Sequence, residues 1–450
     1  MMRSSRRVPA ASLVVLALVS AAVALGTPES GAAQRPSRAR PPVTALTHAT
    51  LVDGTGAAPQ PGRTILIQGK RIQAVFPDGA RPLPEGATVE DLKGRWVIPG
   101  IIDAHVHLTG GPAPADRYIK LLRWAVEHGV VAVRDMAGDD RVLAFFAREA
   151  MLDEIASPDI RYAAFMAGPT FFAEDPRVPG ASEGVMLGSA PWMRAVDGAS
   201  DIRMVVAEAK GTGAAALKLY ANLPASIVSA LTAEAHRQGM MAWAHATVFP
   251  AKPSDVVAAG VDVLSHAPYL VWEAAPRVPQ DYTARAMGDF EHVRPDDPRI
   301  LAVLDSMKAR GEILDATLHV FEEEAARTPD RVGKGIVAWE GAVTRIAHER
   351  GVLVDAGTDG MGSPEDTVPN IYREMASLVH DAGFTPLEAI GAATRVAAMA
   401  LGISATHGTV SPGKMADMVV LSADPAEDIE NTRDIVEVWK HGKKYAPEGK

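Results

Sequence analysis

The chain has 450 residues, of which 47% are hydrophobic and 22% are charged, and its formal net charge is −10. This composition is typical of a globular protein and argues against a disordered chain or a multi-pass membrane protein, while the acidic balance disfavours nucleic-acid binding. The sequence contains no cysteine, which excludes disulfides and thiolate metal sites, so any metal ion must bind nitrogen and oxygen ligands.

Residues 1–33 have the pattern of a signal peptide. Three arginines among the first seven residues precede an apolar run at residues 10–25, and small residues follow up to Ala33. The apolar run is shorter than the roughly 18–20 residues that span a bilayer. We therefore expect an exported protein, periplasmic or extracellular, without a membrane anchor after cleavage.

The two ends of the chain have a similar β texture. Residues 34–42 combine proline and arginine without an apolar period, which predicts a linker. Short β-branched runs separated by turn residues then fill residues 43–94, and the same pattern returns in residues 406–450. We expect these two segments to build one small β-sandwich domain.

Between them, residues 95–405 alternate strand and helix signals. Predicted helices at 202–210, 224–238, 254–259, 298–310 and 335–350 each end at a glycine. Eight strand candidates occur in order: WVIPGIIDAHVH, VVAVRDM, IRYAAFM, ALKLY, MMAWAH, VDVLSH, EILDATL and VLVDAGTD. Eight βα steps predict an α/β protein with a (β/α)8 TIM barrel, and a doubly wound open sheet is the alternative.

The positions of six polar residues favour the barrel. They lie at or just after the C-terminal ends of the predicted strands: His105, His107, Lys218, His245, His266 and Asp359. A barrel brings such residues to one site, whereas an open sheet separates them. His105 and His107, two residues apart on a strand, face the same side and can bind one metal ion. Taken singly, each histidine also fits a hydrogen-bonded core residue, and Asp359 fits a turn.

The motifs that contain these residues resemble the amidohydrolase superfamily. They are VIPGIIDAHVHL, ALKLYA, AWAHAT, VLSHAP and AGTDG, followed by EAIGAATRVAAMALGI and GTVSPGKMADMVVL, and the resemblance extends from about Leu51 to the C-terminus. It implies a distorted barrel beside a β-sandwich, and a centre of two metal ions whose bridging hydroxide attacks an amide, ester or related bond.

The resemblance also implies a role for each residue. It assigns His105 and His107 to the buried metal, Lys218 to a carboxylated bridge, His245 and His266 to the second metal, and Asp359 to the last ligand and proton acceptor. A cationic lysine beside two dications would be repelled, so Lys218 fits only as a neutral amine or an anionic carbamate. Nitrogen and oxygen ligands at a hydrolytic centre favour zinc, two ions per chain, with manganese or iron as alternatives.

Two further residues are candidates for contact with a small-molecule substrate. Tyr220 faces the same way as Lys218 and can donate a hydrogen bond to a substrate carbonyl. His319 follows the seventh strand and is a candidate either for contact with substrate or for support of the residues that hold the metals. Resemblance to imidazolonepropionase-like exported dipeptidases implies cleavage of an amide bond in a dipeptide or N-acyl amino acid. The long stretches 168–200 and 268–298 would shape the pocket, and they contain four candidate carboxylate-binding arginines: Arg177, Arg194, Arg277 and Arg285.

Two other functions are open at this stage. A mononuclear relative would act as a deaminase or on a cyclic amidine, but such sites commonly place a glutamate where this chain has Val248, and Lys218 favours two metals. A non-catalytic exported metal-binding protein would be expected to lack the general base, whereas Asp359 is present. The sequence leaves the oligomeric state open, a homo-oligomer included.

The signal-peptide interpretation predicts where the mature chain begins. Cleavage after the small residues should leave Gln34, or Thr27 if the earlier small-residue site is used, as the first residue of the exported protein. N-terminal sequencing of exported protein measures this directly, and a chain that still starts at Met1 or Met2 would contradict the interpretation.

Overall fold

The computed structural model describes residues 41–282, 288–328 and 335–446, so the predicted signal peptide and most of the predicted linker lie outside the described residues. Eight parallel strands follow one another in chain order around a barrel. They are β6 (Ile101–Val106), β7 (Val130–Asp135), β8 (Asp159–Ala167), β11 (Ala216–Ala221), β12 (Met241–His245), β13 (Val263–Ser265), β14 (Ile313–Asp315) and β15 (Leu353–Asp355). The amide of Ala104 donates to the carbonyl of Ala356 at 3.0 Å, next to the last strand, which joins the two ends of the ring. The predicted (β/α)8 barrel is confirmed.

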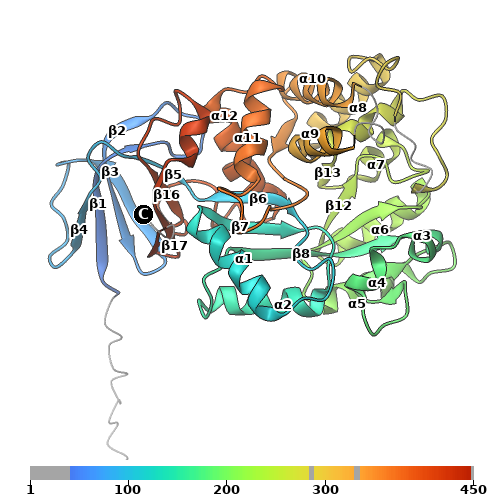
Figure 1. Ribbon diagram of the computed structural model, residues 1–450, viewed down its shortest axis with the longest axis horizontal. Helices are drawn as coiled ribbons and strands as arrows, with labels where there is room; N and C mark the ends of the chain where they lie inside the picture. Colours follow the sequence, from blue (N-terminus) through green and yellow to red (C-terminus); the bar gives the residue numbers. More distant parts are fainter. Residues whose placement is uncertain (1–40, 283–287, 329–334, 447–450) are drawn as a thin grey trace, which may run out of the picture. The chain divides into compact units, whose positions relative to one another are not determined.

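Helices between the strands surround the barrel (Figure 1). They are α1 (Ala115–Glu127), α2 (Asp140–Met151), α5 (Ile202–Gly211), α6 (Ala225–Arg237), α7 (Pro253–Ala259), α8 (Pro298–Arg310), α10 (Ile336–Glu349) and α11 (Ile371–His380). The five predicted helices agree with these bounds to within one residue. Helix α8 ends at Gly311, whose φ of +74° is a left-handed conformation that glycine adopts without a steric penalty. Among the described residues, no helix has both the length and the apolar character needed to cross a membrane.

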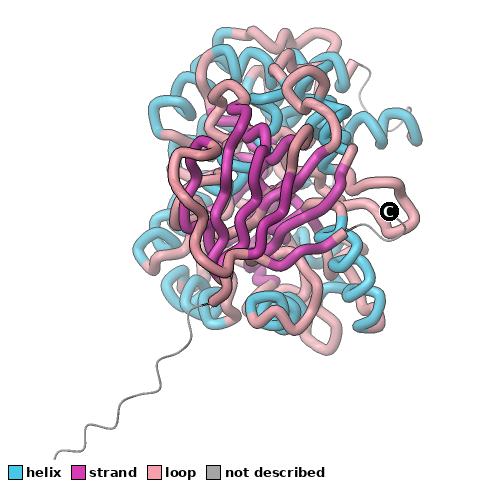
Figure 2. The backbone as a smooth tube through the Cα atoms, turned by 90° about the vertical axis from the view of Figure 1, so that its left-hand side faces the viewer, coloured by secondary structure: helices cyan, strands magenta, loops and turns pink. Residues whose placement is uncertain are grey.

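Both ends of the chain join in one mixed sheet beside the barrel (Figures 1 and 2). Its strands are β1 (Val43–Leu51), β2 (Gln60–Gln68), β3 (Arg71–Pro77), β4 (Thr88–Asp91), β5 (Trp96–Pro99), β16 (Met418–Leu421), β17 (Ile435–Lys440) and β18 (Lys443–Tyr445). Strand β5 pairs with β1 on one side and β16 on the other, so it connects the two ends of the chain. Leu46, Val97 and Trp439 share one apolar core in this sheet.

The first predicted barrel strand is divided between the two sheets. Residues Trp96–Pro99 belong to the terminal sheet, which therefore continues past residue 94, and the barrel begins at Ile101. Gly100 lies between them, where a β-carbon would come within 2.5 Å of the side chain of Val131. The close approach of these segments therefore requires a residue without a side chain.

Three short helices and a 3-10 helix complete the C-terminal part. They are α12 (Pro386–Gly391), the π-helix η3 (Ala392–Val396), α13 (Ala397–Ala400) and the 3-10 helix η4 (Ile429–Arg433). Both η3 and α13 contact β6, the strand that carries the first candidate ligands. This packing supports the first barrel strand from its outer side.

A buried charge cluster joins the terminal sheet to the barrel. The ammonium of Lys440, 3% exposed, lies 2.7 Å from one oxygen of Asp159, and His407 and His441 each lie 3.2 Å from the other oxygen. Burial alone would raise the pKa of Asp159, but the two histidines and Lys440 hold it well below its usual value. The three groups Asp159, His407 and His441 are close enough to hold a metal ion. Because Lys440 already supplies a buried cation there, the cluster is a structural junction.

Candidate metal centre

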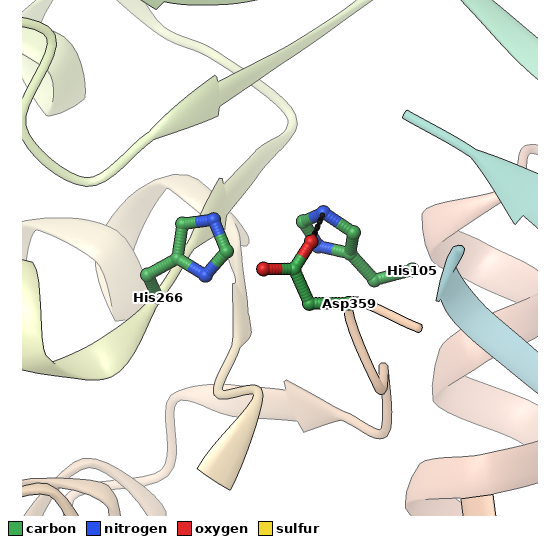
Figure 3. A group of neighbouring side chains, drawn as sticks. All are labelled: His105, His266 and Asp359. Atoms are coloured by element: carbon green, nitrogen blue, oxygen red, sulfur yellow. Dashed lines mark ion pairs between the residues drawn. The ribbon is translucent and has the colours of Figure 1, made fainter. Parts of the chain in front are cut away.

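Five barrel strands bring the predicted ligands to one mouth of the barrel. His105 and His107 come from the end of β6, Lys218 lies on β11, His245 ends β12, His266 follows β13, and Asp359 follows β15. The ring centroids of His105 and His266 are 5.1 Å apart, and those of His245 and His266 are 4.7 Å apart. The carboxylate of Asp359 lies between the rings of His105 and His266 (Figure 3).

Asp359 contacts both histidines of the first strand. Its Oδ1 atom lies 3.2 Å from Nε2 of His105 and 2.9 Å from Nε2 of His107. Burial alone would raise the pKa of Asp359, but the neighbouring histidines lower it well below its usual value. The carboxylate is therefore ionised at neutral pH and can act as a ligand or as a proton acceptor.

His105 is oriented by a buried carboxylate that the sequence analysis did not single out. Nδ1 of His105 lies 2.6 Å from Oδ2 of Asp315, the last residue of β14, and the same oxygen accepts a hydrogen bond from Arg134 at 2.9 Å. Burial alone would raise the pKa of Asp315, but His105 and Arg134 lower it far below its usual value. An ionised Asp315 favours the proton on Nδ1, which leaves the Nε2 lone pair directed at the centre, as is usual for metal-binding histidines.

His266 and His245 differ in how their Nδ1 atoms are satisfied. Nδ1 of His266 lies 2.9 Å from Oγ1 of Thr317. Nδ1 of His245 is buried without a hydrogen-bond partner in the described part of the chain. Burial, followed by the charge of Lys218, lowers the pKa of His245 well below its usual value, so its ring is neutral. A buried imidazole nitrogen with a free lone pair calls for an explanation, and a metal ion supplies one.

Positive φ angles occur in two proposed ligands, His266 (+73°) and Asp359 (+54°), and in Thr317 (+53°), which contacts His266. Non-glycine residues adopt this left-handed conformation infrequently, and such local strain concentrates at functional sites. Each of these residues directs its side chain into the cluster or onto another member of it. The strand ends are thus bent to bring the side chains together.

Lys218 is fully buried beneath the histidines. Its Nζ atom lies 3.2 Å from Oγ of Ser265, the last residue of β13. Burial lowers the pKa of Lys218 to about 7, although Asp315 and Asp359 partly oppose this effect. A large share of Lys218 is therefore an uncharged amine near neutral pH, which is the form that can react with carbon dioxide.

A cavity of about 490 Å³ opens onto the cluster, and His107, His266 and Asp359 line it. Its other walls are mainly aromatic: Phe165, Phe171, Tyr220, Tyr269, Trp272, Tyr282, Phe290 and Phe321. These residues come largely from the loops after β8 and β13, as predicted for the stretches 168–200 and 268–298. The loops form α3 (Pro169–Glu174), α4 (Val178–Ala181), β9 (Ser189–Ala190), β10 (Met193–Ala195) and the 3-10 helix η1 (Ala267–Glu273).

Tyr220 and Arg177 form the polar edge of this wall. The hydroxyl of Tyr220 lies 3.1 Å from Nη2 of Arg177 and 3.3 Å from the hydroxyl of Tyr282. Asp175 accepts from Nε at 2.9 Å and from the same Nη2 atom at 2.7 Å. Nη1 of Arg177 has no acceptor among the described residues, and the side chain is 61% exposed.

The structure distinguishes among the four candidate arginines. Arg177 lines the cavity, whereas Arg194 and Arg277 do not. Arg194 instead lies 3.4 Å from Glu208. Arg285 lies outside the described residues.

His319 is not among the residues that line the cavity, so the structure does not support its predicted contact with substrate, and a role in supporting the site stays a prediction. Helix α9 (Leu318–Arg327) begins directly before it, so Val320, Phe321 and Glu324 face the cavity. The ring of His319 is directed instead toward Glu322, at 3.7 Å. The helical period, which a sequence motif does not reveal at this position, therefore turns His319 away from the pocket.

Comparison with known proteins assigns the family. Residues 96–444 match the model of the amidohydrolase family. The chain belongs to the amidohydrolase family. An imidazolonepropionase from Chromobacterium violaceum is 26% identical over 81% of this amidohydrolase and 87% of its own length. An ochratoxinase from Aspergillus niger is 30% identical over 36% of the chain and 34% of its own length.

Solved structures show the same fold. A putative prolidase from Bifidobacterium longum has a TM-score of 0.69 and 24% identity, over 90% of this amidohydrolase and 96% of its own chain. A Xaa-Pro dipeptidase has a TM-score of 0.71 and 21% identity, over 90% of this chain and 100% of its own chain. Family membership and the hydrolase relatives support a hydrolytic enzyme that acts on carbon–nitrogen bonds of small molecules. They indicate no nucleic-acid or membrane partner.

The residues of this amidohydrolase suit divalent cations, as expected in a family that is generally metal-dependent. His105, His266 and Asp359 each offer a ligand atom, and these atoms lie within 4.8 Å of one another. The free Nδ1 of His245 and the neutral amine of Lys218 border the same cluster. Imidazole and carboxylate donors without sulfur favour zinc and neighbouring first-row metals.

The contact between Asp315 and His105 generates a testable prediction. Asp315→Asn keeps the size of the side chain but removes the charge that holds the proton on Nδ1 of His105. We expect the metal affinity to fall roughly 10- to 100-fold, the usual effect of losing such a partner. Competition with a chromophoric chelator measures the affinity.

The control is Glu340→Gln, which changes a buried carboxylate that is 1% exposed and does not contact any proposed ligand. Asp315→Asn should also lower stability, because Arg134 loses its charged partner. Thermal unfolding of the metal-free proteins measures this loss of stability separately from the loss of metal affinity. Unchanged metal affinity in Asp315→Asn would show that Asp315 does not orient a ligand.

Proposed function

We propose that this protein is a binuclear metal-dependent hydrolase that cleaves the amide bond of an N-acyl amino acid or dipeptide. The observation that carries the proposal is the combination, in one cavity, of the candidate ligands, an aromatic wall and the available edge of Arg177. The similarity to a putative prolidase and a Xaa-Pro dipeptidase agrees with a peptide-like substrate. Lys218 and the absence of a glutamate at Val248 favour this function over the mononuclear alternative.

Each predicted ligand has a place in the proposed centre. His105, His107 and Asp359 would hold one cation, His245 and His266 the other, and Lys218, as a carbamate, would be shared by both. Zinc is the proposed metal, with manganese or iron as alternatives. When bound, such cations acidify a water molecule and polarise a carbonyl group.

Asp359 and Tyr220 would act on the substrate itself. The ionised carboxylate of Asp359 can accept a proton from the attacking water and deliver it to the leaving nitrogen. Burial raises the pKa of the Tyr220 hydroxyl well above its usual value, so the hydroxyl remains protonated. It can then donate a hydrogen bond to the oxygen on which negative charge develops.

Arg177 would recognise the free carboxylate of the substrate. Asp175 fixes the plane of the guanidinium through two hydrogen bonds, and Nη1 remains available for an anion. A charge-assisted hydrogen bond of this kind contributes about 1.5–3 kcal/mol. The aromatic wall would bury a large apolar side chain on the same substrate. The predicted signal peptide supports the further proposal that this activity lies outside the cytoplasm.

A panel of paired substrates tests the proposal. The zinc-loaded protein should hydrolyse N-acetyl-phenylalanine, and its kcat/KM should be roughly 10- to 100-fold higher than for N-acetyl-phenethylamine, which lacks the carboxylate. Arg177→Met should remove most of this difference, whereas Arg194→Met, outside the cavity, should preserve it. The proposal is wrong if the metal-loaded protein hydrolyses no N-acyl amino acid or dipeptide, or if the carboxylate has no effect.

A further inference from the structure

Asn222 connects three segments of the pocket wall. It follows β11 and lies two residues after Tyr220. Its Nδ2 atom donates to Oγ1 of Thr170 at 2.7 Å and to Oδ2 of Asp281 at 2.6 Å. Its Oδ1 atom accepts a hydrogen bond from the amide of Tyr282 at 2.7 Å. One amide side chain therefore joins the end of a barrel strand to the loops after β8 and β13.

The backbone around Asn222 favours this residue type. Its φ angle is +57°, a left-handed conformation that asparagine tolerates better than most residues. The carbonyl oxygen of Asn222 packs closely on Gly168, because a β-carbon added to Gly168 would lie only 2.1 Å from that oxygen. The amide of Gly168 also donates to the carbonyl of Ala221 at 2.9 Å. The start of the β8 loop is therefore held against the end of β11 by backbone and side-chain contacts together.

These contacts determine where the wall tyrosines lie. The hydrogen bond to the amide of Tyr282 fixes its backbone beside Asn222, and the Tyr282 ring centroid is 5.3 Å from that of Tyr220. Phe171, next to Thr170, packs against both rings, at 5.2 and 5.9 Å. The aromatic wall is thus assembled from three chain segments, and Asn222 has a hydrogen bond to each of the two loops.

We infer that Asn222 is a specificity-determining positioning residue, which holds Tyr282 and the α3 loop in the arrangement that binds the apolar part of the substrate. This inference rests on the proposed function. Asn222 does not line the cavity, so it acts through the residues that it holds. Its loss should therefore weaken substrate binding more than the chemical step.

Two substitutions separate the side chain from the backbone. Asn222→Gly allows the positive φ angle but removes all three side-chain hydrogen bonds. Asn222→Asp keeps the size but places a second carboxylate against Asp281. For N-acetyl-phenylalanine we expect both variants to raise KM at least tenfold and to change kcat less than threefold, with metal content unchanged. Thr170→Val removes the hydrogen bonds of Oγ1 with Asn222 and with Asp281 but keeps the other two bonds of the Asn222 side chain. It should raise KM by a smaller factor and serves if the other variants fold poorly.

The control is Asn431→Gly, which removes the hydrogen bond from the Asn431 side chain to the carbonyl of Asp424, far along the chain from the pocket loops. It should leave KM unchanged even if it lowers the unfolding temperature. A merely structural role for Asn222 predicts lower stability in its variants without a change in KM.

Two measurements on the metal-free protein avoid dependence on catalysis. In Asn222→Gly, hydrogen exchange should become faster in the peptides that contain Thr170 and Tyr282. Calorimetry should show that N-acetyl-phenylalanine binds more weakly, with a rise in Kd of about the same factor as the rise in KM. If wild type binds this ligand and the variants bind it equally well, only the inference about Asn222 is overturned. If wild type does not bind or hydrolyse it, the proposed function and the inference fall together.

Discussion

Most of the polar groups at the mouth of the barrel are buried, and each buried group needs a partner, whereas His107 and Asp359 are partly exposed to the cavity. Asp315 and Arg134 form a fully buried ion pair at 2.9 Å, and Asp315 also accepts from His105. Thr317 satisfies one nitrogen of His266, and the carbonyl of Ala137, at 3.1 Å, satisfies one of His107. In each case the protein provides a partner for the Nδ1 side of the ring, and the other nitrogen is left to the centre of the cluster.

The remaining unsatisfied groups explain why the site suits cations. His245 keeps a buried Nδ1 without a partner among the described residues, and burial lowers the pKa of Lys218 to about 7, so a large share of it is uncharged near neutral pH. A set of neutral imidazoles, an ionised carboxylate and a neutral amine has lone pairs but few protons to share. Divalent cations satisfy such a set because one cation binds several lone pairs at once, whereas a water molecule has only two protons to donate. The cluster by Asp159 contrasts with it, because Lys440 supplies the positive charge there.

The sequence predicted the parts of this arrangement that follow local rules. Glycine-terminated helices and apolar strands alternate, so the strand ends and the six polar residues beside them could be placed from the pattern, whereas their proposed roles as ligands came from the family resemblance. Asp315 could not, because nothing near it in the sequence indicates contact with a histidine 210 positions away. The sequence could not show whether His319 lines the pocket, because the left-handed turn at Thr317 and the immediate start of α9 reset the direction of the side chains. The pocket loops lack a repeating pattern, so Arg177 could not be selected from its three alternatives before the fold was known.

The central claim is a centre of two metal ions that depends on Lys218, and metal stoichiometry tests it most directly. Wild-type protein and Lys218→Ala would be stripped with chelator, reconstituted with zinc in bicarbonate buffer and measured by plasma mass spectrometry. Two zinc ions per chain are expected in wild type. The variant should bind clearly less zinc, and added acetate should restore part of the bound zinc because a small carboxylate can replace the carbamate. A wild-type protein that binds one zinc ion, together with a Lys218→Ala variant of the same metal content, would contradict the account.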